Sequence, residues 1–256
     1  MGYQNVIEKG SCHLSVVMPA YNEANAIYKS VLQTIEELSN FCSCFEIVVV
    51  NDGSTDDTYE EIKKVSSVDK RVIPINISEN VGKGNALKFG TKVSRGDLVA
   101  FLDADMDLHP AQLESFMAKM ENENADVVIG SKIHKDSEVD YPLQRRIISR
   151  IYYFGLAVLF RLKVSDTQVG IKLFKGDLIR EVMEKILVKR FAYDVEVLVL
   201  CSKKGAKIID HPVKLDYQRG GPWGRMRIKD LWHAAWDTMA IFYRLYILRY
   251  YDKEQP

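Results

Sequence analysis

The sequence predicts an α/β fold in which a mostly parallel central sheet carries helices on both faces. Five short apolar runs have the length and composition of buried strands, and turn residues or segments with helical spacing separate them. This alternation is typical of a parallel sheet covered by helices. Polar or acidic residues follow three of the runs, at the carboxyl edge of the sheet, where such folds bind ligands. The runs are residues 14–18, 45–50, 72–77, 98–102 and 126–130.

Helices are predicted between these strands. After the first strand stops at Pro19, residues 24–38 place apolar side chains at helical spacing on one face. A turn at 80–85 leads into a helix at about 86–93. His109-Pro110 starts the helix that follows the fourth strand, because proline is favoured in the first turn. The apolar residues of the first helix are Ile27, Val31, Ile35 and Leu38.

The second half of the chain has a less regular pattern. We expect helices at 141–163, 177–187 and 191–203, and strands at 167–174 and 207–217. A long helix from about 226 to 250 has a broad apolar face that carries Trp and Tyr residues. Two interpretations of this amphipathic helix are equally favoured. It packs on the core, or it lies on a membrane surface.

Composition and charge narrow the classes of function. The chain has 256 residues, of which 47% are hydrophobic and 27% charged, as in ordinary globular proteins. The formal net charge is zero, so bulk charge offers no support for nucleic-acid binding, and we expect none. The four cysteines lack metal-ligand spacing and are expected to be reduced thiols in the cytoplasm. They are Cys12, Cys42, Cys44 and Cys201.

No segment is predicted to cross a membrane. Residues 1–13 are polar and mixed, unlike a signal peptide, and are expected to form a flexible tail. The uncharged stretch Ile151–Phe160 is too short, because a helix of that length reaches about 15 Å and a span needs roughly 20 apolar residues. This stretch is therefore expected to lie on a membrane or within a core.

Three carboxylates follow the fourth strand at alternating positions: Asp103, Asp105 and Asp107. Their mutual repulsion must be offset, and a hard divalent cation with oxygen ligands is the simplest means. A single aspartate would suffice to cap the helix at Pro110, so three favour a Mg²⁺ or Mn²⁺ site that holds a phosphate-bearing substrate.

Other motifs are weaker when taken singly. Asp52, in Asn51-Asp52-Gly53-Ser54, can bind a nucleoside or cap a helix. Gly82-Lys83-Gly84 matches neither a P-loop nor a dinucleotide fingerprint. The spacing of Thr167–Lys172 does not decide between function and surface polarity. Asp194 and Glu196 lie in an otherwise apolar helix, where acids are costly to bury unless they are used or paired.

Taken in order, the motifs resemble those of family-two glycosyltransferases with the GT-A fold, and most of all dolichyl-phosphate β-glucosyltransferases and related polyprenyl-phosphate hexosyltransferases. The resemblance covers about residues 14–220. The motifs are 17–23 (Val-Met-Pro-Ala-Tyr-Asn-Glu), 51–54 (Asn-Asp-Gly-Ser), 80–84 (Asn-Val-Gly-Lys-Gly), 103–105 (Asp-Ala-Asp), 130–132 (Gly-Ser-Lys), 167–174 (Thr-Gln-Val-Gly-Ile-Lys-Leu-Phe) and 193–196 (Tyr-Asp-Val-Glu).

The resemblance implies inverting transfer of a hexose, glucose before mannose, from a UDP- or GDP-sugar to a polyprenyl phosphate, with Mg²⁺ or Mn²⁺. It implies a GT-A domain at 14–224, with a nucleotide-sugar half at 14–131, an acceptor half at 132–224, and the amphipathic helix at 225–256. Asp103, Asp105 and Asp107 would hold the metal. Catalytic residues would be Lys132, Gln168, Lys172, Asp194 and Arg219. The nucleotide sugar would contact Pro19, Ala20, Tyr21, Glu23, Asp52, Lys83, Asp103 and Ala104.

Three substitutions and one absence depart from the family pattern. Asn51 replaces the first Asp of Asp-Asp-Gly-Ser, and Asp107 stands where relatives often have Gln or a small residue. Lys132 replaces an Arg, which loses a bidentate grip on phosphate. The additional membrane helices of some relatives are absent.

The acceptor decides which catalytic groups are needed. A phosphate monoester has a second pKa near ~6 and is mostly dianionic at neutral pH, so no strong general base is required. Cations must instead hold the attacking phosphate, and the candidates are Lys132, Arg145, Arg146, Lys172 and Arg219, the last as a clamp on the loop 219–224. Asp194 or Glu196 would orient a cation or the sugar.

The lipid acceptor implies a peripheral position on the cytosolic face of a membrane. Residues 147–162 and 226–250 combine apolar and aromatic residues with arginines and are predicted to form that surface. Three alternatives remain: a glycosyltransferase that acts on a hydroxyl and needs Asp194 as base, a nucleotidyltransferase, and a non-catalytic nucleotide-sugar-binding module.

Overall fold

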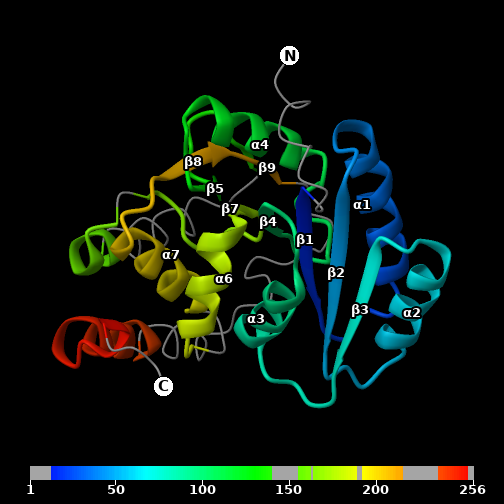
Figure 1. Cartoon of the computed structure of the whole chain (residues 1–256), viewed down its shortest axis with the longest axis horizontal. Helices are drawn as coiled ribbons and strands as arrows, with labels where there is room; N and C mark the ends of the chain where they lie inside the picture. Colours follow the sequence, from blue (N-terminus) through cyan, green and yellow to red (C-terminus); the bar gives the residue numbers. More distant parts are fainter. Residues whose placement is uncertain (1–12, 140–154, 163, 189–191, 216–235, 253–256) are drawn as a thin grey trace.

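The computed structural model describes residues 13–139, 155–162, 164–188, 192–215 and 236–252 (Figure 1). A seven-stranded sheet in the order β3-β2-β1-β4-β7-β5-β8 forms its centre. All neighbouring strands in it are parallel except β7, which runs antiparallel to both β4 and β5. The strands are β1 (Leu14–Ala20), β2 (Phe45–Asp52), β3 (Val72–Ile77), β4 (Leu98–Phe101), β5 (Val127–Ser131), β7 (Lys172–Lys175) and β8 (Ile208–Pro212).

Helices cover both faces of the sheet, as predicted. Residues of α3, α6 and α7 belong to one apolar core, and residues of α1, α2 and α4 belong to the other. The centre of β2 is continuously apolar because both faces of the sheet are covered: Val48 and Val50 face the first core, while Ile47 and Val49 face the second. The helices are α1 (Ile27–Phe41), α2 (Thr58–Val68), α3 (Lys83–Val93), α4 (Gln112–Asn122), α6 (Gly176–Lys185) and α7 (Tyr193–Lys203).

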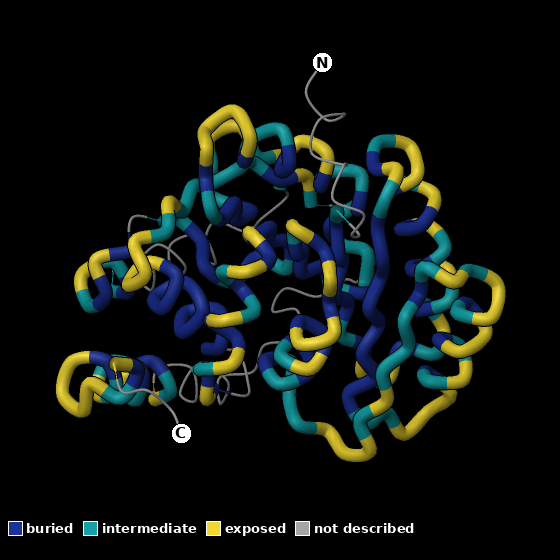
Figure 2. The backbone as a smooth tube through the Cα atoms, viewed as in Figure 1, coloured by how far each residue is buried: buried dark blue, intermediate teal, exposed yellow. Residues whose placement is uncertain are grey.

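Buried residues follow this layering along the chain (Figure 2). The predicted apolar face of α1 is correct, because Ile27, Val31, Ile35 and Leu38 all belong to the second core. The helix α7 is apolar on every side, and residues 193–201 are all buried. It is therefore an internal helix, and any polar side chain on it must find its partners within the protein.

The second half of the chain departs from the predicted boundaries. The strand expected at 167–174 is confined to Lys172–Lys175, because residues before it form a loop with side-chain hydrogen bonds of its own. The strand expected at 207–217 is two pieces, β8 and β9 (Lys214–Leu215), and β9 pairs with β6 (Glu138–Val139). Because β7 lies between β4 and β5, the predicted nucleotide-sugar and acceptor halves contribute to one sheet.

The C-terminal segment is helical but not one continuous α-helix. Within its described part, residues 236–242 are α-helical, Tyr243–Ile247 form a π-helical turn, and Tyr250–Asp252 form a 3₁₀ turn. Phe242 and Tyr246 pack against Phe160 of the short helix at 155–160, with ring centroids 6.3 Å and 6.5 Å away. Both predicted lipid-facing segments thus meet where they are described. No helix among the described residues has the length and apolar character needed to span a bilayer.

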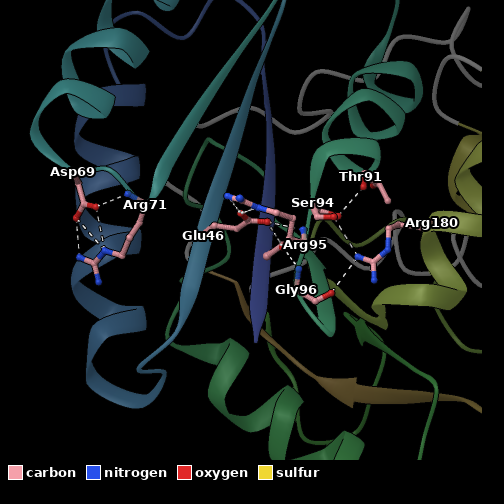
Figure 3. A network of polar contacts seen from close by, with 9 residues as sticks. Glu46, Asp69, Arg71, Thr91, Ser94, Arg95, Gly96 and Arg180 are labelled. Atoms are coloured by element: carbon pink, nitrogen blue, oxygen red, sulfur yellow. Dashed lines mark hydrogen bonds and ion pairs between the residues drawn. The ribbon is translucent and has the colours of Figure 1, made fainter. Parts of the chain in front are cut away.

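A polar network fixes the amino-terminal edge of the sheet (Figure 3). Glu46 of β2 is buried, and its Oε1 accepts hydrogen bonds from Ser15 Oγ at 2.7 Å and from the backbone N–H of Arg95 at 2.7 Å. The Arg95 guanidinium lies 3.0 Å from Oε2, and Arg180 donates to the carbonyl of Gly96 at 3.1 Å. This network ties the starts of β1, β2 and β4 together, at the edge opposite the predicted site.

Candidate active site

The loops after β1 and β2 interlock at the carboxyl edge of the sheet. Asn22 donates its backbone N–H to Ser54 Oγ at 3.0 Å, and its Oδ1 accepts the backbone N–H of Thr55 at 2.9 Å. The backbone N–H of Glu23 reaches Thr58 Oγ1 at 2.8 Å. Of the residues predicted to contact the nucleotide sugar here, Tyr21 is 45% exposed, while Glu23 is buried. Pro19 and Ala20 end β1 directly beneath this loop.

Asp52 organises the loop that leads into α3. Its Oδ1 accepts the backbone N–H of Val81 at 2.9 Å, and its Oδ2 accepts that of Gly82 at 3.1 Å. Burial raises the pKa of Asp52, and these two hydrogen bonds oppose the rise. Gly53 is required beside it, because φ is +66° and a Cβ would lie 2.3 Å from the backbone nitrogen of Asn80. Both carboxylate oxygens of Asp52 therefore accept hydrogen bonds that hold the loop at 81–82.

Lys83 begins α3 and joins this loop to the acidic stretch. Its Nζ lies 2.5 Å from Asp103 Oδ1. Burial alone would lower the pKa of Lys83, but the charges of Asp103 and Asp194 outweigh that effect and raise it. The weak Gly-Lys-Gly motif thus supplies a cation to the carboxyl end of β4.

Asp105 lies in the middle of the acidic stretch, and its carboxyl group has a raised pKa. Burial, and then the charges of Asp103 and Asp107, raise the pKa of Asp105 to about 6. Within the described residues, no three carboxylate, imidazole or thiol groups are grouped closely enough to hold a metal by themselves. The donor chemistry nevertheless suits Mg²⁺ or Mn²⁺, because clustered carboxylates favour a hard cation whose remaining ligands come from water or a diphosphate. Ala104, between two of the acids, is buried.

Lys172 and Asp194 form a buried ion pair next to this cluster. Lys172 Nζ lies 2.6 Å from Asp194 Oδ1 and donates to the carbonyl of Val169 at 2.5 Å. The two side chains are 2% and 8% exposed. Burial raises the pKa of Asp194, although Lys172 and Lys83 oppose the rise. The ion pair with Lys172 thus offsets the unfavourable free energy predicted for burial of Asp194.

Asp166 joins two of the predicted site residues, Lys132 and Gln168. Asp166 was not identified from the sequence as a site residue. This fully buried carboxylate accepts the backbone N–H of Lys132 at 3.2 Å and that of Gln168 at 3.0 Å. No spacing signal marks Asp166, because its partners are backbone N–H groups, one two residues further along its own loop and one on the distant loop after β5. Gly170 places the same stretch against the acidic cluster, since a Cβ there would lie 2.3 Å from Asp103 Oδ2.

The structure therefore brings Lys83, Asp103, Lys172 and Asp194 into one polar cluster, with Lys132 and Gln168 joined through Asp166. Three predicted cations, Arg145, Arg146 and Arg219, lie outside the described residues.

The chain is similar in sequence to known proteins. The family model "Glycosyl transferase family 2" matches residues 15–183. A dolichyl-phosphate beta-glucosyltransferase of Trichomonas vaginalis (ALG5D) is 30% identical over 269 residues, which cover 98% of this chain and 80% of that protein. A dolichyl-phosphate beta-glucosyltransferase of Dictyostelium discoideum is 30% identical. The matched region covers 77% of this chain and 64% of that protein. Glycosyltransferase AglD of Haloferax volcanii is 29% identical over 78% of this chain, which spans 32% of that longer protein.

Solved structures show the same fold. Glucosyl-3-phosphoglycerate synthase from Mycobacterium tuberculosis superposes with a TM-score of 0.67 at 22% identity, over 91% of this chain and 79% of that one. Mannosyl-3-phosphoglycerate synthase from Rubrobacter xylanophilus gives a TM-score of 0.64 at 18% identity, over 96% and 76% of the two chains. The family match covers more than half of the chain, and the fold agrees with it. The chain therefore belongs to glycosyl transferase family 2 and is a glycosyltransferase with the GT-A fold.

Proposed function

We propose that this enzyme transfers glucose, or failing that mannose, from a UDP- or GDP-sugar to a dolichyl or polyprenyl phosphate, with inversion at the anomeric carbon. The observation that carries the proposal is the buried Lys172–Asp194 pair beside the Lys83–Asp103 pair. A carboxylate already bound to a lysine suits the orientation of a substrate, and a phosphate acceptor needs no strong general base. Similarity to dolichyl-phosphate beta-glucosyltransferases over nearly the whole chain supports the same acceptor.

The donor is assigned to the carboxyl edge of β1, β2 and β4. Tyr21 is exposed there, and Asp52 shapes the loop that presents Lys83. Mg²⁺ or Mn²⁺ at Asp105 and its acidic neighbours would neutralise the departing diphosphate. A solved glucosyl-3-phosphoglycerate synthase with this fold was crystallised with Mn²⁺ and UDP, which supports that cofactor and a UDP-sugar. The residues assigned to the nucleotide sugar are Pro19, Ala20, Tyr21, Glu23, Asp52, Lys83, Asp103 and Ala104.

Asp194 and Lys172 are assigned to orientation. Lys172 is buried and bonded to Asp194 and Val169, so it holds Asp194 in place. In the transfer step, an oxygen of the acceptor phosphate attacks the anomeric carbon while the bond to the diphosphate breaks. We assign contact with the sugar and the acceptor phosphate to Lys132 and Gln168, whose backbone N–H groups Asp166 holds. Arg219 is assigned to close over these two substrates.

Membrane association follows from the acceptor. The described part of the C-terminal segment exposes Trp236 (76%), Met239 (54%) and Ile247 (62%), and Val158 of the neighbouring helix is also exposed. Aromatic and aliphatic side chains of this kind are typical of an interfacial surface. We assign the enzyme to the cytosolic face of a membrane, with residues 14–224 as catalytic domain and 225–256 as membrane-associating segment.

A donor and acceptor panel tests the proposal. The purified protein is incubated with UDP- or GDP-glucose or -mannose, Mn²⁺ or Mg²⁺, and a short polyprenyl phosphate, and glycolipid is measured. Transfer from UDP-glucose that is lost in Asp105→Asn supports it. Transfer only to a sugar hydroxyl, or release of pyrophosphate from a nucleoside triphosphate, would refute it in favour of another transferase. Binding of UDP-sugar without any turnover would indicate a non-catalytic module.

A further inference from the structure

Glu196 is a buried carboxylate that the proposed chemistry does not use. It lies in the first turn of α7, two residues after Asp194, and is 0% exposed. A carboxylate without solvent must have partners for both oxygens, because an unpaired buried charge is strongly destabilising. Those partners come from two segments far apart in the sequence.

Each oxygen of Glu196 binds one of these segments. Oε2 accepts the backbone N–H groups of Leu187 at 3.0 Å and Val188 at 2.7 Å. Oε1 accepts the hydroxyl of Tyr251, and Arg244 Nη2 lies 3.9 Å from the same oxygen. Glu196 therefore joins the loop after α6 to the C-terminal segment, through hydrogen bonds that are stronger than neutral ones because the acceptor is charged.

A groove lies between the two segments that Glu196 joins. It is open to solvent and has a volume of about 480 Å³, within the range of small-molecule sites. One wall is Leu187 and Val188, and the other is Trp236, Asp237, Ala240, Tyr243 and Arg244. The outer residues are apolar and exposed, with Leu187 at 40%, Tyr243 at 52% and Trp236 at 76%. Both walls are thus held by the same carboxylate, which sets the distance between them.

The inner wall of the groove touches the donor side of the active site. A Cβ on Gly84 would lie 2.7 Å from the carbonyl oxygen of Val188 and 2.8 Å from Cβ of Tyr193. Gly84 directly follows Lys83, which pairs with Asp103. Lys88 of the same helix donates to the carbonyls of Glu184 at 2.8 Å and Ile186 at 3.1 Å. Val188, which lines the groove, therefore packs directly on the start of α3.

We propose that this groove receives the isoprenoid chain of the acceptor and that Glu196 is a positioning residue that sets its width. The inference rests on the proposed function and adds the place of the lipid chain to it. An apolar chain suits the groove because its outer residues are apolar, and because its inner wall adjoins the site where the acceptor phosphate must react. A short isoprenoid does not extend into the outer groove, whereas a long one does.

The test compares a short and a long acceptor in matched variants. Tyr251→Phe removes one hydroxyl from Glu196 and keeps the ring, and Glu196→Gln removes the charge. The control is Asp252→Asn, which breaks an exposed ion pair with Lys203 on the same segment. Steady-state constants are measured for UDP-glucose, citronellyl phosphate and undecaprenyl phosphate.

Tyr251→Phe is expected to raise KM for undecaprenyl phosphate about tenfold, as for the loss of one buried hydrogen bond to a charged acceptor. KM for citronellyl phosphate and UDP-glucose stays within about twofold, and Asp252→Asn changes none of the three. Equal increases for both lipids, or no increase for the long one, would overturn the inference even if Glu196→Gln fails to fold. A wild-type protein that uses neither lipid would refute the proposed function as well.

Discussion

Replacement of Lys172 by methionine tests the buried ion pair most directly. The change keeps the length and apolar stem of the side chain but leaves Asp194 without the ammonium group that lies 2.6 Å away. Both side chains are almost fully buried, at 2% and 8% exposed. Breaking such a pair costs about 3–5 kcal/mol, because it strands a buried charge. The carbonyl of Val169 also loses its 2.5 Å hydrogen bond.

Urea denaturation of four proteins measures this cost: wild type, Lys172→Met, Asp194→Leu and the double variant. We expect the double variant to recover most of the stability lost in Lys172→Met, since apolar replacement of both partners is often neutral. Glycosyl transfer should not recover, because Asp194 is assigned to substrate orientation. A loss below about 1 kcal/mol in Lys172→Met, the range of exposed pairs, would contradict the reasoning.

The pH dependence of Lys172→Met supplies an independent check. Burial already raises the pKa of Asp194, and Lys172 opposes the rise, so the variant raises it further. A carboxyl group whose folded pKa exceeds its unfolded value binds more protons when folded, so the free energy of unfolding increases as pH falls toward the unfolded pKa. Lys172→Met should therefore lose less stability relative to wild type at pH 5 than at pH 8. An equal deficit at both pH values would show that Asp194 has the same charge in the variant as in wild type, as it would if it gained another cation.

Three other variants test the candidate active site and the polar network at the amino-terminal edge of the sheet. Gly170→Ala would place a Cβ 2.3 Å from Asp103 Oδ2. We expect metal-dependent turnover to fall about a hundredfold, while circular dichroism shows that the fold is retained. Near-normal turnover would disprove the contact. Asp166→Ala removes the acceptor of two loop N–H groups, and transfer should fall about tenfold while UDP affinity stays unchanged; a parallel loss of UDP binding would contradict this separation. Glu46 lies at the amino-terminal edge of the sheet, opposite the site, so Glu46→Ala should lower the free energy of unfolding by about 2 kcal/mol and leave kcat unchanged. An altered kcat would contradict this expectation.

Local pattern was sufficient for the strands and helices of the first half of the chain. The apolar run at residues 47–50 of β2 and the spacing of Ile27, Val31, Ile35 and Leu38 on α1 follow from burial against two cores, and both predictions are correct. The same reasoning failed before β7. Residues 167–171 look like a continuation of the strand, but the backbone N–H of Gln168 binds Asp166 and the carbonyl of Val169 binds Lys172, and these two bonds hold the start of the segment as a loop. The π-helical turn at Tyr243–Ile247 also has no signal in apolar spacing.

By itself, the sequence determined the fold class, the family and the residue types at the carboxyl edge, because each depends on short apolar runs and the polar residues that end them. Only the tertiary structure decided which groups are partners. Lys172 is paired with Asp194, both oxygens of Asp52 are bound to the loop at 81–82, and Glu196 holds two segments that no local pattern connects. The physical reason is that a buried charge must be satisfied by whatever donors the fold brings to it. Those donors are backbone N–H groups and distant side chains, which have no signature in sequence spacing.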